Sequence, residues 1–457
     1  MAREIRFSIG PFLLYGTQAV ALASTVIHPL MPLVLMVAGI SAVFLFYFPQ
    51  ILLVLLATVA LIKGALITQF PLLESVDFSV VLSSLVLLVL LWRLTDPKMR
   101  FHIGHYRNIM AAFVGWVLWM IMTSIYAPHL EAAMVKGLRF AFFTSVLFFG
   151  PLVFIKTREE SRIVLKLFFA GGLLGALYLL GYLAVSVITR QSLLGLTRLT
   201  ILTSNPIAAG RVLSISAAMA AAMLITNRDK MLQWGLLMVV LLIAVLFTGS
   251  RGPMLSFVVA TFLVGILSGR KAFRRSVNLG FGLLLVFMVV LILLPRELIL
   301  RFGVDLPDEI ARTNRGIGAF NTVTHRFHLW DMAIALWTKD LQHFLFGAGS
   351  ASYGMLFPWR DFRYPHNLPL EILAEYGLIG LGMFSIHFLS IVKRVALKLR
   401  SGLQNEELLW LTAALTMALA TMTSGDLNDN RMLWFFLGGL LATMNVDQRL
   451  QGNSNLV

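Results

Sequence analysis

The sequence contains no cysteine, which excludes disulfide bonds, thiolate catalysis and cysteine-ligated metal sites. Charge is also scarce: only 13% of the 457 residues are Asp, Glu, Lys or Arg, whereas about a quarter are charged in soluble globular proteins. Apolar residues make up 58%, and they form continuous runs instead of the period-two alternation of an outer-membrane barrel. These features predict an all-α polytopic integral membrane protein.

Long apolar runs recur along the whole chain, and a helix needs roughly 20 such residues to cross a bilayer. The runs cover 10–27, 30–48, 51–69, 78–92, 109–127, 138–155, 163–188, 206–226, 231–248, 253–268, 277–295, 370–392, 407–424 and 432–445. The first four are crowded and interrupted, so we expect roughly 12–14 transmembrane helices in a single membrane domain over 1–457. The N-terminal run follows Arg3 and Arg6 without a small-residue cleavage site, and we expect it to be retained as a span.

The distribution of basic residues predicts the orientation. The net charge is +15, and most of the basic residues lie in every second short loop, such as 93–107 and 270–275. Because they are not gathered on one solvated face, nucleic acid is disfavoured as a partner. By the positive-inside rule these loops and both termini are cytoplasmic. The remaining loops then face outward: 70–77, 128–137, 189–205, 249–252, 296–365 and 425–431.

The segment 296–365 is much longer than the other loops. Structureless loops of this length are uncommon in compact folds and are usually functional. The amphipathic run from Arg326 to Leu341 predicts a helix within it, and the glycines of Phe346-Gly347-Ala348-Gly349-Ser350 predict a break after it.

The outward-facing basic residues are nearly all arginine, which runs against the positive-inside rule. They are Arg139, Arg190, Arg198, Arg211, Arg251, Arg296, Arg301, Arg312, Arg315, Arg326, Arg360, Arg363 and Arg431, against only Lys136 and Lys339. Because a guanidinium donates two parallel hydrogen bonds to phosphate and stays charged, the cluster favours binding of a pyrophosphate. Pairing with nearby Asp and Glu residues, or with lipid head groups, is the alternative for any single arginine.

Two of these arginines occupy distinctive positions. Arg211 lies about one turn into a predicted span after Asn205-Pro206, where a charge is either functional or reaches outward to the interface. Arg251 lies in Thr248-Gly249-Ser250-Arg251-Gly252-Pro253. The glycines there either expose amides beside the guanidinium or serve a tight turn between two helices.

The richest local pattern is Tyr364-Pro365-His366-Asn367, at the entrance to the span 370–392. His366 is a candidate general base, since histidine transfers protons near neutral pH; an interfacial hydrogen bond is its alternative role. Asn367 is a candidate helix cap. Glu371 and Glu375 lie one turn apart, where they would orient His366 or neutralise an arginine.

His325 and His328 are three residues apart, but no carboxylate-rich motif accompanies them, and we expect no metal site.

These motifs, in this order, resemble the O-antigen ligase family and its wider superfamily of ligases and polymerases. The similarity covers about residues 200–440. It rests on Ser250-Arg251-Gly252, Arg312, Arg315, His325-Arg326-Phe327-His328-Leu329-Trp330, Phe346-Gly347-Ala348-Gly349, His366-Asn367, Glu371, Glu375, Gly377 and Gly380.

The resemblance implies a metal-independent inner-membrane glycosyltransferase of the GT-C type, with twelve spans and no cofactor. Such a ligase transfers a polysaccharide from undecaprenyl pyrophosphate to a sugar hydroxyl of lipid A–core at the periplasmic face. By this resemblance His366, Arg251 and Arg326 are the catalytic candidates, although Arg312 and Arg315 match the loop arginine almost as well. The residues expected to bind substrate are Arg211, Arg312, Arg315, Arg363, Asn367 and Glu371.

In the expected mechanism the arginines hold the pyrophosphate and stabilise the charge that grows on it. His366 removes the proton of the acceptor hydroxyl, and direct displacement inverts the anomeric carbon. An O-antigen polymerase or a protein O-oligosaccharyltransferase would reuse the same residues with another acceptor. A polytopic transporter or lipid flippase is a further alternative, disfavoured because the ionisable residues gather at one face and no related halves are visible.

Overall fold

The structure is a computed structural model that describes residues 46–69, 77–95, 106–189, 199–202, 204–227, 230–293, 317–356 and 364–446, together with 39, 41, 43 and 44. Within these ranges all regular elements are helices and there is no strand. The longer helices are α3 (Pro49–Gln69), α4 (Phe78–Leu94), α6 (Arg107–Met122), α7 (Leu130–Arg139), α8 (Ser145–Phe154), α9 (Arg158–Ile188), α10 (Pro206–Thr226), α11 (Met231–Thr248), α12 (Arg251–Leu267), α13 (Arg270–Leu293), α15 (Ile317–Trp337), α18 (Leu368–Ser401), α19 (Asn405–Thr421) and α20 (Met432–Met444). Short elements are η2 (Thr123–Tyr126), η3 (Phe140–Thr144), α16 (Leu341–Phe346), α17 (Ser352–Leu356) and η7 (Asp429–Arg431).

The prediction of a helical, multi-pass membrane protein is confirmed. Among the described residues, six stretches are long and apolar enough to cross a membrane: 107–126, 130–154, 158–186, 206–226, 231–248 and 368–401. Three shorter apolar helices lie at 49–64, 78–94 and 251–267. Every predicted apolar run from 51–69 onward coincides with a helix, while 10–27 and most of 30–48 lie outside the described residues.

Helix α10 lies at the centre of the fold and is buried along most of its length. It packs against α9, α11, α12 and α19. Its sequence is rich in Ala, Ser and Gly, and such small side chains let neighbouring backbones approach closely. One such contact places Ser216 of α10 against Gly172 of α9, where a Cβ would collide with the serine. Large aromatic side chains, including Trp116, Trp410 and Trp434, fill the core around α6, α19 and α20.

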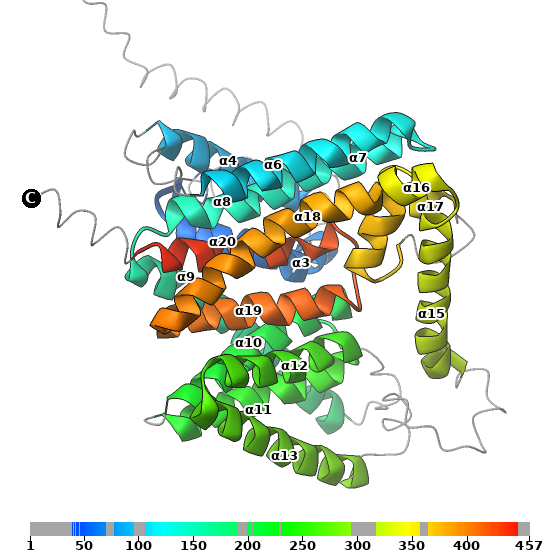
Figure 1. Cartoon of the computed structure of the whole chain (residues 1–457). Helices are drawn as coiled ribbons and strands as arrows, with labels where there is room; N and C mark the ends of the chain where they lie inside the picture. Colours follow the sequence, from blue (N-terminus) through cyan, green and yellow to red (C-terminus); the bar gives the residue numbers. More distant parts are fainter. Residues whose placement is uncertain are drawn as a thin grey trace, which may run out of the picture.

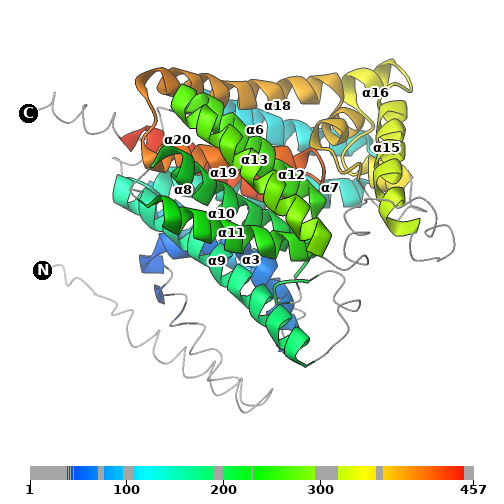
Figure 2. The ribbon, with the colours of Figure 1, turned by 90° about the horizontal axis from the view of Figure 1, so that it is seen from below.

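The segment before α18 contains helices of its own, as the sequence predicts. Helix α15 begins before the predicted residue 326 and ends at Trp337. The chain breaks there because Asp340 caps the following helix, its side chain accepting a hydrogen bond from the backbone N of His343 at 2.8 Å. Figure 1 shows α15 at one end of the bundle, next to α16 and the start of α18, and Figure 2 shows the same neighbours from below. We refer to this as the α15 end of the molecule.

Candidate active site

The start of α18 is fixed by a side-chain cap, which confirms Asn367 as a helix cap, while its role in substrate binding remains a prediction. Its Oδ1 accepts a hydrogen bond from Leu370 N at 3.1 Å, and its Nδ2 donates to the Met422 carbonyl at 3.3 Å. The first bond satisfies one of the backbone donors that a helix N-terminus leaves unpaired. The second ties the start of α18 to the end of α19. Asn367 is therefore engaged on both sides by protein groups.

His366 precedes this cap in an unusual conformation. Its φ is 57°, in the left-handed region that costs a non-glycine residue about 1–3 kcal/mol. The side chain is buried, with the residue 6% exposed, and its ring meets the Tyr364 ring edge to face at a centroid distance of 4.5 Å. Strained residues of this kind cluster at functional sites because the surrounding structure holds them there.

Helix α15 is bonded directly to the His366 segment. The Trp330 indole Nε1 donates a hydrogen bond to the Pro365 carbonyl at 3.0 Å, next to His366 in the chain. Arg326 lies about one turn before Trp330 on the same helix. The structure thus places α15 and its arginine beside the segment that carries the candidate base, although the two lie 40 positions apart in sequence.

Arg251 and Arg326 are neighbours in space. The pKa of the Arg326 guanidinium is lowered by burial and, in addition, by the positive charge of Arg251. Arg251 is the first residue of α12, and the turn before it needs glycine, because Gly249 has a φ of 64°. Ser250 Oγ fixes the turn by donating to the Pro206 carbonyl at 2.9 Å. The glycine therefore serves the turn that precedes Arg251.

Arg211 does not reach outward to an interface. It is only 4% exposed, and its guanidinium points to the segment that follows α19. Nη2 donates to the Ser424 carbonyl at 2.5 Å and to Ser424 Oγ at 3.1 Å, while Nη1 donates to the Asp429 carbonyl at 3.2 Å. The Nε atom is buried without a hydrogen-bond partner among the described residues. The predicted role of Arg211 in substrate binding remains a prediction.

Glu371 and Glu375 both bind a lysine, Lys136. Lys136 of α7 donates to Glu371 Oε1 and Glu375 Oε2, each at 2.6 Å. The backbone N of Leu427 also donates to Glu371 Oε1 at 3.3 Å, and that of Ala351 to Glu375 Oε2 at 3.0 Å. Both glutamates are fully buried. The described residues thus pair both glutamates with Lys136, whereas a role in orienting His366 or neutralising an arginine, and substrate binding by Glu371, remain predictions.

The glycines of the Phe346–Gly349 and Gly377 motifs shape the same region. Gly377 interrupts α18 with φ 66° and ψ −168°, and a Cβ there would collide with the Leu345 carbonyl. The break frees backbone carbonyls, which accept hydrogen bonds from Ala348 N, Gly349 N and the Trp119 indole at 2.9, 3.0 and 3.2 Å. These motifs therefore position the start of α18 by backbone contact.

Several predicted site residues lie outside the described part of the chain. They are Arg312, Arg315 and Arg363, together with the side chain of His325. His328 is described and exposed on α15. Among the described residues no three His, Asp or Glu side chains gather as metal ligands, and independence from metals remains a prediction.

Sequence reasoning missed three charged residues around this region: Lys136, Asp426 and Asp429. The pKa of the Tyr364 hydroxyl is raised by burial and by the negative charges of Asp429 and Asp426, so both carboxylates lie near the Tyr364–His366 pair. The pKa of Asp429 is itself raised by burial and by Asp426. For Lys136 the sequence did offer a signal, because it is one of only two lysines among the outward-facing basic residues.

The fold and this constellation define a helical, multi-pass membrane protein with arginines gathered near a buried histidine at one end of the bundle. Residues 236–385 match the family model described as O-antigen ligase. The matched region runs from α11 into α18 and contains Arg251, Arg326 and His366. The chain thus carries an O-antigen ligase family region, which supports its membership of the O-antigen ligase superfamily. No curated protein matches the sequence.

Proposed function

We propose that this protein is an O-antigen ligase of the bacterial inner membrane. It transfers a polysaccharide from undecaprenyl pyrophosphate to a sugar hydroxyl of lipid A–core, with the α15 end facing the periplasm. The family match supports a lipid-linked glycan as substrate. The observation that supports the proposal is that α15, whose Arg326 is influenced electrostatically by Arg251, is hydrogen-bonded through Trp330 to the Pro365 carbonyl next to His366.

The proposed membrane architecture is a twelve-span GT-C fold. The six long spans and three shorter apolar helices are compatible with it. The donor keeps its polyprenyl tail in lipid, so its pyrophosphate has to be held where helices meet the membrane surface. Arg251 begins α12 and His366 precedes α18, so both occupy helix entrances of this kind.

Arg251 and Arg326 would bind the pyrophosphate. A guanidinium is always charged and forms paired hydrogen bonds to phosphate oxygens. Two like charges held close together repel each other, and a bound dianion between them removes that repulsion. As the glycosidic C–O bond breaks, negative charge grows on the leaving pyrophosphate, and fixed cations stabilise this transition state more than the ground state.

His366 would act as the general base. The acceptor oxygen forms the new bond to the anomeric carbon while its proton passes to the imidazole, and the bonding electrons of the old C–O bond leave with the lipid pyrophosphate. Attack from the side opposite the leaving group inverts the anomeric carbon. The Trp330–Pro365 bond and the cap at Asn367 hold the base in place, and such positioning accounts for a large part of catalysis in transfer reactions.

The test is glycan transfer in vitro by the full chain in lipid nanodiscs, with lipid-linked polysaccharide and purified lipid A–core. His366→Ala is expected to lower kcat by about 10²–10⁴-fold, the usual contribution of a general base. His328→Ala, at an exposed histidine on α15, serves as the matched control and should retain activity. A near-normal rate for His366→Ala, or loss of wild-type activity on chelation of divalent metals, would refute the mechanism.

The acceptor decides between members of the superfamily. Offering lipid A–core, a second lipid-linked glycan and an acceptor protein in parallel distinguishes a ligase from a polymerase and from a protein O-oligosaccharyltransferase. Labelling of lipid A–core alone is the expected result. Substrate-dependent uptake into vesicles without a covalent product would instead indicate a transporter.

A further inference from the structure

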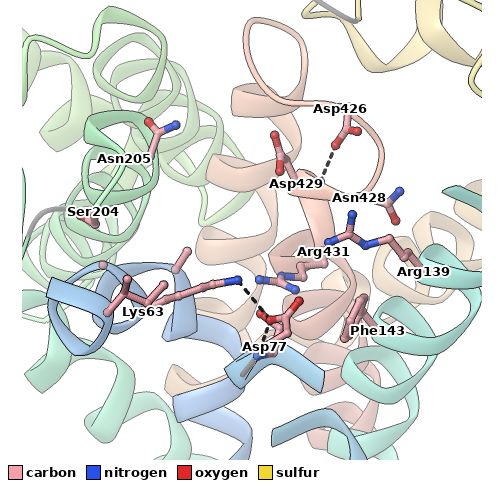
Figure 3. A pocket seen from close by; sticks show the side chains of 14 residues that line it. Lys63, Asp77, Arg139, Phe143, Ser204, Asn205, Asp426, Asn428, Asp429 and Arg431 are labelled. Carbon is pink, nitrogen blue, oxygen red and sulfur yellow. Dashed lines mark hydrogen bonds and ion pairs between the residues drawn. The ribbon is translucent and has the colours of Figure 1, made fainter. Parts of the chain in front are cut away.

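A polar cavity of about 470 Å³ lies beside the candidate active site without including its residues. Its volume is in the range of ligand-binding pockets. It lies between α3, the start of α4, the α7–η3 junction, the start of α10 and the segment 426–431 (Figure 3). Neither His366 nor Arg251 nor Arg326 lines it.

Three cations line this cavity: Lys63, Arg139 and Arg431. Lys63 Nζ lies 3.2 Å from Asp77 Oδ1. The pKa of Arg431 is lowered by burial; the nearby carboxylates of Asp429 and Asp77 raise it, and the positive charge of Arg139 lowers it again. Figure 3 shows all three side chains directed toward the same space. Asp77, Asp426 and Asp429 line the same cavity and partly balance these charges. Arg139 and Arg431, which form no salt bridge with the described residues, are the groups suited to bind an anion.

The same cavity offers groups that bind sugar hydroxyls. Asp426, Asn428 and Asp429 lie along one wall and Asn205 on another (Figure 3). Carboxylates accept hydrogen bonds, and amides both donate and accept them. The Oδ1 atom of Asn428 is buried without a hydrogen-bond partner among the described residues, while its Nδ2 is held by the Lys136 carbonyl at 3.3 Å. Hydroxyl binders beside cations suit a sugar that carries a negative charge.

The position of the cavity relates it to the proposed chemistry. Asp429 and Asp426 act electrostatically on Tyr364, whose ring contacts the His366 ring. Two residues of the cavity wall therefore act on Tyr364, which neighbours His366. Arg326 belongs to α15, and α15 contacts the Tyr364–His366 segment through the hydrogen bond from Trp330 to the Pro365 carbonyl. In a direct displacement the attacking hydroxyl and the leaving pyrophosphate lie on opposite sides of the anomeric carbon. The acceptor and the arginine-bound donor therefore need separate places, and the cavity provides one that Arg251, Arg326 and His366 do not line.

We infer that this cavity is an acceptor subsite that binds an anionic sugar, with Lys63, Arg139 and Arg431 holding a phosphate or carboxylate substituent and Asp429 and Asn428 holding hydroxyls. The inference rests on the proposed function and deepens it. Phosphate and carboxylate share the chemistry that the cations recognise, and the two are separated by experiment.

The first test is the acceptor KM of full-length variants in the transfer assay, with donor saturating. Lys63→Gln and Arg139→Gln are each expected to raise the acceptor KM about tenfold, which corresponds to about 1.4 kcal/mol. The donor KM and kcat should stay within about twofold. Lys63 and Arg139 are suitable because Lys63 is 40% exposed in its side chain and Arg139 is exposed, so folding should tolerate both changes. Lys166→Gln, at an exposed lysine of α9, is the matched control and should leave the acceptor KM unchanged.

Acceptor chemistry provides the second test. Enzymatic removal of phosphate from the acceptor, or reduction of its carboxylates in a separate sample, should raise the wild-type KM to the level of the variants for whichever anion is recognised. The variants should then respond little to the same treatment. An unchanged acceptor KM in both variants, or an equal rise in the donor KM, would overturn the inference.

Direct binding separates this inference from the proposed function. Wild-type protein in nanodiscs is titrated with a phosphorylated, a carboxylated and a neutral oligosaccharide of the same length, with intrinsic tryptophan fluorescence as the signal. Preferential binding of an anionic oligosaccharide that is lost in Arg139→Gln supports the subsite even if no glycan reaches lipid A–core, in which case only the proposed function fails. Equal binding of all three, or binding of none, overturns the subsite.

Discussion

Arginine is used differently at the two ends of this helical bundle. At the end where α9 and α19 begin, which we call the α19 end, three basic side chains of α9 and α18 are neutralised by carboxylates. Arg162 lies 2.8 Å from Glu406 and 2.8 Å from Glu159, Arg158 lies 3.6 Å from Glu406 and 3.8 Å from Glu407, and Lys398 lies 3.2 Å from Glu407. Charge there joins α9, α18 and α19 to one another.

At the α15 end, Arg139, Arg211, Arg326 and Arg431 have other surroundings. Arg211 is bound by carbonyl and hydroxyl oxygens, and Arg326 lies beside another arginine. Among the described residues, Arg139, Arg326 and Arg431 have no carboxylate oxygen within 4.0 Å. The buried carboxylates Glu371 and Glu375 at this end bind Lys136 instead. A high number of arginines therefore does not by itself identify a binding site. The groups that each arginine contacts are more informative.

The largest effect is expected from removing the lysine that occupies the two glutamates. Lys136→Met leaves two buried carboxylates without their cation, and breaking a buried ion pair from one side costs about 3–5 kcal/mol. The measurement is the melting temperature of the detergent-solubilised protein. Adding Glu371→Gln and Glu375→Gln to Lys136→Met should recover much of the loss.

The control for this experiment is at the other end. Lys398→Met removes a lysine of the α19 end, but Glu407 keeps Arg158 at 3.8 Å and the Gln404 backbone N at 2.9 Å. Its melting temperature should therefore fall less than that of Lys136→Met. Equal losses in the two lysine variants would remove the distinction between the ends.

The second effect concerns activity. Arg326→Gln is expected to lower kcat for glycan transfer by about 10²–10³-fold, as for loss of one group that stabilises a developing oxyanion, with a melting temperature near wild type. Arg162→Gln at the α19 end should do the reverse: keep kcat within about twofold and lower the melting temperature slightly, because exposed pairs contribute about 0–1 kcal/mol. Loss of transfer in Arg162→Gln with retention in Arg326→Gln would invert the comparison.

The smallest effect is a backbone one. Gly377→Ala places a side chain at φ 66° against the Leu345 carbonyl, which should destabilise the protein by about 1–3 kcal/mol. Gly382→Ala, five positions further along α18, meets no atom within 4 Å and should stabilise the helix by about 0.5–1 kcal/mol. Melting temperatures that shift in opposite directions would confirm that the break in α18 is specific to the α15 end.

Much of the helical framework could be predicted from the sequence. The expected runs 206–226 and 231–248 match the bounds of α10 and α11, because a long apolar segment has few other ways to satisfy its backbone in lipid. The cap at Asn367 was also predictable, since it depends on residues three positions apart. The number of spans before residue 77 was not, because Pro and Lys interrupt the apolar pattern there.

The partners of the charged residues could not be predicted in the same way. Lys136 meets Glu371 across 235 positions, and Arg211 meets Ser424 across 213. Such pairs depend on how α7, α10 and α18 pack, which hydrophobic periodicity does not specify. The break at Gly377 was missed for a related reason: a lone glycine in an apolar helix usually continues the helix, and only the approach of the Leu345–Gly347 backbone shows why this one does not.

The interruption of α18 has a mechanical consequence. With 34 residues the helix would extend about 50 Å if continuous, well beyond a hydrocarbon core of about 30 Å. Helices that exceed the bilayer adjust by tilting as its thickness changes. Because the break at Gly377 separates the long portion from Leu368–Tyr376, which contacts α16 and is joined to α7 through Lys136, we expect the long portion to tilt with bilayer thickness while the His366 end of α18 stays in place.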